Sequence, residues 1–227
     1  MLQRTATVSS ITVTLPRTAR ESAVRRRASN PETSTSTRHA RRRVEIVAAA
    51  ARVFAERGYH GASTQNIADQ LGIRQASLYY YFESKETALE EVCRVGVEGF
   101  LESAQTIAAG DATATAQVTQ LIAAHLAPLA ERGDFVRVFL RERQHLATAS
   151  RQRIGRISRR YERVIEGVFA VGIKRRELRK DLDVRKMTLA MLGMCNAVAP
   201  WYGHEPRADI KRIVAAFSAL LRDGVRA

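Results

Sequence analysis

The chain has 227 residues with a formal net charge of +14, and 45% of its residues are hydrophobic. This composition is apolar enough to bury a core, which excludes a chain that is disordered throughout, and the length predicts one medium domain or a small domain fused to a larger one. The excess of basic residues predicts a polyanionic partner, either nucleic acid or an anionic membrane surface.

Cysteine spacing and hydropathy exclude further classes of protein. Cys93 and Cys195 are far apart in sequence and form no CxxC or zinc-type cluster, so we expect neither a disulfide framework nor a metal site. The longest apolar run, residues 187–201, is shorter than the roughly 20 residues that span a bilayer, and the N-terminus lacks the apolar core of a secretory signal. Arginine-heavy, alanine-rich usage is typical of GC-rich bacteria. We therefore expect a bacterial cytoplasmic protein without a membrane partner.

Residues 1–40 show no sustained periodicity of apolar residues. Serine, threonine and arginine dominate, and residues 33–37 alternate threonine with serine. Because such a segment cannot offset the entropy of ordering by burial, we expect a disordered basic N-terminal extension. Residues 1–43 hold ten arginines against two glutamates, a net charge of +8. The arginines at 25–27 could contact DNA phosphates, and a solvated tail is the equal alternative.

A helical period begins at Arg41. Apolar residues recur there with the spacing of one helix face, at Val44, Val47, Ala51 and Phe54. Gly58 should end this helix, and Ser63 is suited to cap a short second helix. The inner face of that second helix is predicted to hold Ile67, Ala68 and Leu71.

Gly72 separates the second helix from a third, which we expect from Arg74 or Gln75 to Phe82. Ser84 should cap a fourth helix. Two short helices joined by a tight turn at a glycine are typical of a helix-turn-helix.

The rest of the chain is predicted to be helical as well. One helix face is marked by Val118, Leu121, Ile122, His125, Leu126 and Leu129. After a break at Gly133 and Asp134, the next is marked by Phe135, Val138, Phe139 and Leu146. A long helix follows with Ile154, Ile157, Tyr161, Val164, Ile165 and Val168. The last two extend from Val184 to about Ala199 and from Asp209 to about Leu221. No alternating strand pattern of useful length is present, so the predicted fold is all-α.

The third helix has an unusual outer face. On a wheel turning about 100° per residue, Leu78 and Phe82 share the buried side. The outward side holds Ala76, Ser77 and Tyr80, with Tyr79 and Tyr81 flanking it. At least two of three consecutive tyrosines must project, which an ordinary soluble surface does not favour. DNA contact explains them, and packing against the first helix or another subunit is the alternative.

These residue types suit a helix in the major groove, whose N-terminal residues reach base edges. Gln75 can form hydrogen bonds with adenine, and Ser77 can bond to a donor or an acceptor on a base. Ala76 can contact a thymine methyl. Tyrosine hydroxyls and Lys85 suit phosphate oxygens. Thr64, in the first turn of the preceding helix, can bind a phosphate through its hydroxyl and free backbone N–H groups.

The sequence also carries a longer motif. It reads Thr64-x-x-Ile67-Ala68-x-x-Leu71-Gly72-Ile73-x-x-Ala76-Ser77-Leu78-Tyr79-x-Tyr81-Phe82-x-x-Lys85. This motif, within residues 43–92, resembles the DNA-binding domain of TetR-family transcriptional repressors. The resemblance implies base contacts for Gln65, Gln75, Ala76, Ser77 and Tyr80. It implies phosphate contacts for Thr64, Tyr79, Tyr81 and Lys85. The family more often has Gly or Pro at the Ala76 position and His at the Tyr81 position.

After the extension at 1–40, the resemblance implies a helix-turn-helix DNA-binding domain at 41–91 and a helical ligand-binding and dimerisation domain at 92–223. In that family the last two helices pair with their mates in a four-helix bundle. The apolar stripes at 184–198 and 210–221 therefore predict a homodimer, with packing inside one subunit as the alternative. A two-fold dimer would place its recognition helices in major grooves about 34–36 Å apart, on a pseudo-palindromic DNA operator.

A weaker resemblance concerns the effector. Segments 139–142, 181–183 and 193–202 are similar to TetR-family regulators that sense acyl-CoA thioesters. This implies an apolar pocket lined by Phe139, Met191, Met194 and Trp201, with Arg143 forming an ion pair with a carboxylate or phosphate of the ligand. The alternatives are core positions for the methionines and phenylalanine, an ion pair or solvation for Arg143, and a dimer interface for Trp201. His125 is expected to be a hydrogen-bonded core histidine, with ligand contact as the alternative.

The expected function is a ligand-responsive DNA-binding transcriptional regulator, nucleoid-associated when bound to DNA. It is most simply a repressor that leaves its operator when a small apolar or acyl-CoA-type effector binds. Drugs or other hydrophobic compounds are alternative effectors, and activation is an alternative outcome. The sequence contains no HExxH, P-loop or GxSxG motif, so we expect no catalytic residues and no cofactor. An architectural DNA-binding protein and an all-α enzyme with an apolar pocket remain as rival classes.

Overall fold

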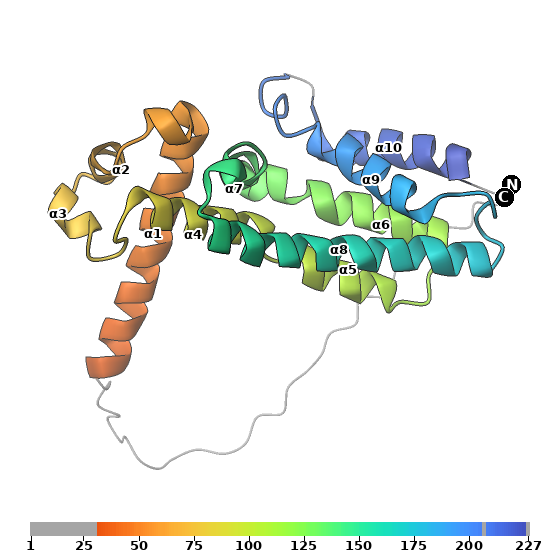
Figure 1. Cartoon of the computed structure of the whole chain (residues 1–227), viewed down its shortest axis with the longest axis horizontal. Coiled ribbons are helices and arrows are strands. Elements are labelled where there is room, and N and C mark those ends of the chain that lie inside the picture. Colours follow the sequence, from red (N-terminus) through yellow and green to blue (C-terminus); the bar gives the residue numbers. More distant parts are fainter. Residues whose placement is uncertain (1–30, 206–207, 226–227) are drawn as a thin grey trace, which may run out of the picture.

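The computed structural model describes residues 31–205 and 208–225, and every regular element in those ranges is helical (Figure 1). The first helices are α1 (Pro31–Gly61), α2 (Thr64–Gln70), α3 (Gln75–Leu78) and α4 (Lys85–Val97). They are followed by α5 (Phe100–Ala108), α6 (Ala114–Leu126), α7 (Pro128–Glu142), the 3-10 turn η1 (Arg143–His145), α8 (Thr148–Lys174), α9 (Val184–Asn196) and α10 (Ile210–Val225). The predicted all-α fold is confirmed.

Helix α1 begins at Pro31, ten residues before the predicted helical period. The structure therefore has a helix at residues 31–40, where the sequence analysis expected none, while residues 1–30 lie outside the described residues. Proline suits the first position of a helix because its φ is already helical and its missing N–H would have no partner there. Adding turns to a helix that packing has already nucleated costs little, so no apolar period is needed.

The buried face of α1 is offset from the predicted one. Val47, Ala51 and Phe54 are buried as expected, but Val44 is 69% exposed and Ile46 is buried instead. Val44 lies at the edge of the buried arc, so the helices that cover α1 leave it in solvent.

The helix-turn-helix prediction is confirmed. Ser63 caps α2 in a capping box with Asn66, accepting a hydrogen bond from the Asn66 amide at 3.1 Å. Gly72 has φ +64°, a left-handed conformation that other residues adopt at a cost. Ser84 caps α4 in the same way through Thr87. Helix α3 is shorter than predicted, because the regular helix ends at Leu78 and the tyrosines continue as a turn.

Helix α4 connects the helix-turn-helix to the rest of the molecule. It packs against α1 on one side and α7 on another. Gly96 permits this close approach, because a Cβ there would lie 2.7 Å from the Phe135 carbonyl oxygen. Gly99, with φ +84°, then separates α4 from α5.

The larger helical part is layered around α6 and α8 (Figure 1). Helix α10 packs on α6, α5 packs on both α6 and α8, and α9 packs on α8. The predicted break at Gly133 and Asp134 is wrong in detail. Helix α6 already ends at Leu126 and Pro128 begins α7, which then bends at Arg132 (φ −142°, ψ 44°).

Both cysteines, Cys93 and Cys195, are free and buried. Burial raises the pKa of the Cys93 thiol and of the Cys195 thiol to about 12, so both remain protonated. In the described ranges, no helix combines the length and apolarity that crossing a membrane requires.

Candidate functional site

Helix α3 lies at the outer end of the molecule, away from the larger helical part (Figure 1). Leu78 and Phe82 anchor it, with only 1% and 4% of each residue exposed. On the opposite side Tyr80 is 76% exposed and Tyr79 is 50% exposed. Ala76 and Ser77 are exposed beside them. The predicted division into a buried and a projecting face is confirmed.

Three of the predicted DNA contacts lie together where α2 meets α3. The Gln75 amide Nε2 donates to the Thr64 hydroxyl at 2.7 Å. The Tyr79 hydroxyl lies 3.4 Å from the same oxygen. This bond orients the Gln75 side chain and leaves its amide oxygen and a second N–H free to bond to a base edge. Gln65 is exposed and donates to Asp69 at 2.6 Å.

His39 of α1 is a neighbour of the tyrosines that the sequence analysis missed. Its ring stacks on Tyr81, with centroids 5.1 Å apart, and meets Tyr80 edge-on at 5.6 Å. No local pattern pointed to His39, because it lies in the segment that was predicted to be disordered. The N-terminal turns of α1 therefore support the tyrosine-bearing turn.

Lys85 is partly committed within the protein. Its Nζ donates to the carbonyl oxygens of Tyr59 and Ala62 at 3.0 and 3.1 Å and lies 4.4 Å from the centre of the Tyr59 ring. One ammonium N–H remains for a phosphate. The Tyr59 hydroxyl donates to Glu86. Burial, together with the Glu86 carboxylate, raises the pKa of Tyr59 to about 12.

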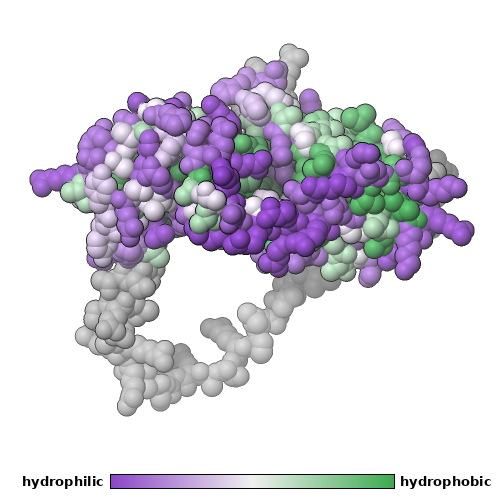
Figure 2. Space-filling model, viewed as in Figure 1, coloured by the Kyte–Doolittle hydropathy of each residue, from purple (hydrophilic) through white to green (hydrophobic). Residues whose placement is uncertain are grey.

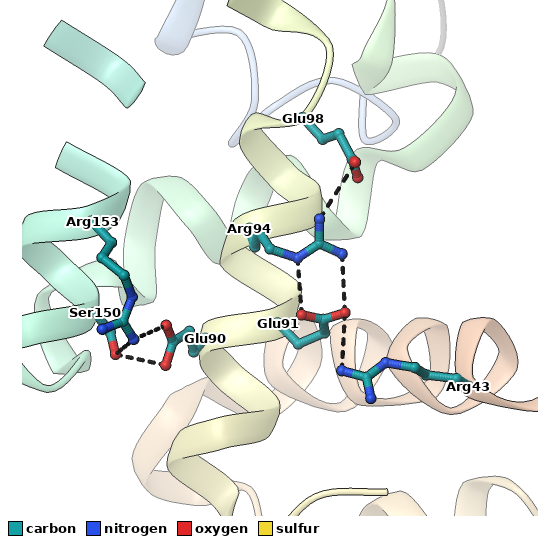
Figure 3. A network of polar contacts seen from close by, with 7 residues as sticks. All are labelled: Arg43, Glu90, Glu91, Arg94, Glu98, Ser150 and Arg153. Atoms are coloured by element: carbon teal, nitrogen blue, oxygen red, sulfur yellow. Dashed lines mark hydrogen bonds and ion pairs between the residues drawn. The ribbon is translucent and has the colours of Figure 1, made fainter. Parts of the chain in front are cut away.

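Ion pairs connect α4 to the helices on both sides (Figure 3). Glu91 contacts Arg94 at 2.9 Å and Arg43 of α1 at 3.4 Å. The Arg94 hydrogen bond, aided by the nearby arginine charges, lowers the pKa of the Glu91 carboxyl.

On the other side of α4, Glu90 accepts a hydrogen bond from Ser150 at 2.6 Å and pairs with Arg153 of α8. Such partly exposed pairs each contribute about 0–1 kcal/mol. They connect α4 to α1 on one side and to α8 on the other.

A cavity of about 80 Å³ lies among α4 to α9. Its wall is mostly apolar, with Val97, Phe100, Ile157 and Leu192 among the contributors. Two predicted ligand contacts, Phe139 and Arg143, line it, and the Arg143 guanidinium lies 5.0 Å from the centre of the Phe139 ring.

The other three predicted ligand contacts are not among the residues that line this cavity. Met191 is completely buried in the core, and Met194 is half-buried. Trp201 is 39% exposed beyond the end of α9. Met191 therefore takes the alternative of a core position, and the sequence does not show which side of a helix faces a hollow.

A hydrogen-bonded group of three polar side chains, His125, Tyr161 and Asn196, lies in this wall. His125 is buried, and its Nδ1 lies 2.9 Å from the Tyr161 hydroxyl. Its Nε2 lies 3.0 Å from Oδ1 of Asn196, and its ring stacks on Phe100 at 5.0 Å. The prediction of a hydrogen-bonded core histidine is confirmed, and the same residue also lines the cavity. Burial lowers the pKa of His125 and raises that of the Tyr161 hydroxyl.

A larger groove of about 780 Å³ adjoins the cavity, because Leu140, Arg143 and Asn196 line both. The groove also carries Arg137 and Arg141 of α7. Acidic residues temper this charge, since Asp134 pairs with Arg137 at 2.8 Å and Glu56 of α1 lies on the far wall. A ligand in the groove would therefore contact α1 of the helix-turn-helix part as well as the larger part.

Exposed apolar side chains gather on the larger part. They are Val171 of α8, Leu189 of α9, Trp201 in the segment between α9 and α10, and Leu220 of α10. Figure 2 shows apolar residues over the part of the molecule far from α3, whereas hydrophilic residues dominate the α3 end. Such clustering marks a contact surface more often than isolated exposed residues do.

Comparisons with known proteins match both parts of the chain. Residues 46–92 match the family described as bacterial regulatory proteins, tetR family. Residues 111–225 match the family described as tetracyclin repressor-like, C-terminal domain.

Individual relatives cover most of the chain. The fatty acid metabolism regulator protein of Bacillus subtilis is 27% identical over 183 residues, covering 80% of this chain and 94% of that protein. The solved structure of ketosteroid transcriptional regulator KstR2 of Mycobacterium tuberculosis has a TM-score of 0.76 at 24% identity, covering 82% and 95% of the two chains. The solved structure of FadR from Bacillus subtilis in complex with stearoyl-CoA has a TM-score of 0.66 at 27% identity, covering 80% and 98%.

Proposed function

Because the chain belongs to the TetR family of transcriptional regulators, we propose that it is a repressor that binds a pseudo-palindromic operator as a homodimer and releases it when an acyl-CoA thioester binds. The observation that carries the DNA-binding part is the outward face of α3. Tyr79 and Tyr80 project beside Ser77 while Leu78 and Phe82 hold the turn from behind. This arrangement suits a surface that inserts into a groove.

The division of roles follows from the contacts. Gln75, Ala76, Ser77, Tyr80 and Gln65 would contact bases. Thr64, Tyr79, Tyr81 and Lys85 would contact phosphates. Gln75 and Tyr79 converge on the Thr64 hydroxyl, so base and phosphate contacts would be set by one cluster.

The exposed apolar residues of α8 to α10 support the homodimer. Leu189 and Leu220 are 48% and 66% exposed, and burying them against a second copy would remove apolar area from water. The two recognition helices would then be held about 34–36 Å apart, the repeat of the major groove on one side of DNA.

An apolar cavity joined to an arginine-bearing groove supports an acyl-CoA effector. The acyl part needs an apolar wall, and the phosphates of CoA need cations such as Arg137, Arg141 and Arg143. A relative with 27% identity has been solved with stearoyl-CoA. Release of DNA requires the effector to bind the DNA-free state more tightly, and a tenfold loss of operator affinity needs about 1.4 kcal/mol of coupling.

Operator binding is tested with DNA from upstream of the protein's own gene. Fluorescence anisotropy should show binding at least ~10³-fold tighter than to random DNA at physiological salt. Light scattering should show a dimer, free and on DNA. Equal affinity for random DNA, or a monomer on the operator, would refute this part of the proposal. Repression is tested with a reporter driven by the same promoter. The reporter should be more active when the gene is deleted; lower activity would indicate an activator.

A further inference from the structure

Tyr161, His125 and Asn196 form a chain of hydrogen bonds that ends at the cavity. A neutral imidazole carries one proton and one lone pair, so it can donate once and accept once. Since Oδ1 of Asn196 can only accept, Nε2 of His125 carries the proton and donates to it at 3.0 Å. Nδ1 then accepts from the Tyr161 hydroxyl at 2.9 Å. One tautomer satisfies both bonds.

This chain fixes the orientation of the Asn196 amide. Its oxygen is held by His125, so its Nδ2 hydrogens point away from the histidine. Among the described residues, the hydrogen bond of this side chain is made through Oδ1, and Nδ2 makes none. The side chain therefore presents two donors whose position is set by a buried residue from another helix.

Asn196 lies where the two hollows meet. It lines the apolar cavity and also the arginine-bearing groove. Glu162, the charged acid on the cavity wall, is paired with Arg185 at 2.7 Å, so it does not compete as a free charge. A ligand that places an apolar group in the cavity and an anionic group in the groove must pass Asn196 at the point where the two groups join.

The sizes of the hollows indicate which end of such a ligand is small. The cavity holds about 80 Å³, several times the roughly 10–15 Å³ of such space that one water molecule needs, so it suits a short acyl chain. The groove holds about 780 Å³, within the range of sites for drug-sized ligands.

We propose that Asn196 is a specificity-determining residue whose Nδ2 donates a hydrogen bond to the thioester carbonyl of a compact acyl-CoA. The acyl group occupies the cavity behind Phe139, and the phosphates lie in the groove beside Arg137 and Arg141. This inference rests on the proposed acyl-CoA effector and adds the group that is recognised. His125 and Tyr161 are positioning residues, because they orient Asn196.

The test compares butyryl-CoA with S-butyl-CoA, the thioether that lacks only the carbonyl oxygen. Calorimetric titration of the full chain should show the thioester binding about three- to tenfold more tightly, the effect of one hydrogen bond between neutral groups. In Asn196→Ala this ratio should fall to about one, and in His125→Phe it should fall partway. Ser158→Ala is the control, because Ser158 also lines the cavity but its hydroxyl donates to the Ile154 carbonyl; it should keep the wild-type ratio.

The ratio separates recognition from structural damage, since a distorted pocket weakens both ligands. Stearoyl-CoA and S-octadecyl-CoA give the same comparison for a long chain. Equal binding of both members of each pair by the wild type, or an unchanged ratio in Asn196→Ala, overturns the inference while leaving an acyl-CoA effector intact. Failure of every CoA ligand to bind overturns both the inference and the effector class, and operator binding then stands or falls on its own test.

Discussion

The side chains proposed to face DNA carry little charge. Gln75, Ser77 and Tyr80 are neutral, and the Lys85 ammonium already donates to two carbonyl groups. Discrimination between sequences should therefore come from hydrogen bonds and apolar contacts to bases, with the arginines elsewhere adding salt-sensitive affinity.

Tyr80 offers a direct test at this scale. Tyr80→Ala should weaken operator binding about tenfold or more while changing the free energy of unfolding by less than about 0.5 kcal/mol, because 76% of the residue is exposed. Anisotropy titrations and urea melts measure the two quantities, and Tyr80→Phe isolates the hydroxyl. Unchanged operator affinity in Tyr80→Ala would remove this residue from the interface.

His125 should make stability depend on pH. Burial lowers its pKa below the ordinary value of 6.5, so the unfolded chain binds a proton there before the folded chain does. Its contribution is complete above about pH 6.5 and decreases as pH falls below that value.

Between pH 7.5 and 5.5 the wild type should lose about 1 kcal/mol more stability than His125→Gln. Urea denaturation at the two pH values measures this difference, and the other histidines are common to both proteins. Parallel pH profiles would contradict a buried neutral His125.

At the scale of residues, the apolar spacing predicted the buried positions Leu78, Phe82 and Ile165 correctly. It could not predict the partner of His125, because Asn196 is 71 positions away and no local pattern encodes such a distance.

Among the elements, α8 shows how packing constrains one helix at two glycines. A Cβ at Gly172 would lie 2.5 Å from the Ala114 Cβ and 2.7 Å from Leu178 Cδ1, whereas a Cβ at Gly167 would meet nothing within 4 Å. Both positions have ordinary helical backbones and differ in the space around them. Substitution by alanine should therefore have opposite effects on stability at the two positions.

Gly172→Ala should lower the free energy of unfolding by about 1–3 kcal/mol through overpacking. Gly167→Ala should raise it by up to about 1 kcal/mol, because alanine favours a helix. Thermal or urea unfolding of the two variants measures this contrast. Equal effects would mean that α8 does not pack against α6 as closely as described.

The elements also show where local patterns end. Caps at Ser63 and Ser84 and the turn at Gly72 were predictable because their signals lie within a few residues. The early start of α1 and the end of α3 at Leu78 were not, since neither depends on an apolar period. The cavity was only partly predictable, because its wall combines residues from six helices.

For the whole molecule, the proposed dimer should depend on the exposed apolar residues. Leu220→Asp should shift the protein toward monomer in analytical ultracentrifugation, because a carboxylate would have to be buried in the interface. Operator affinity should fall with it. Val44→Asp is the matched control, since Val44 is equally apolar and exposed but lies on α1. A dimer of unchanged strength in Leu220→Asp would place the interface elsewhere.

The central claim is that binding of the effector weakens binding of the operator, and that operator binding weakens effector binding in turn. It is tested most directly by measuring the dissociation constant of the operator by anisotropy, with and without a saturating acyl-CoA, using butyryl-CoA and stearoyl-CoA in turn. The account predicts that at least one raises the operator dissociation constant tenfold or more, and that operator DNA weakens that acyl-CoA by the same factor. An operator affinity that neither compound changes would contradict it.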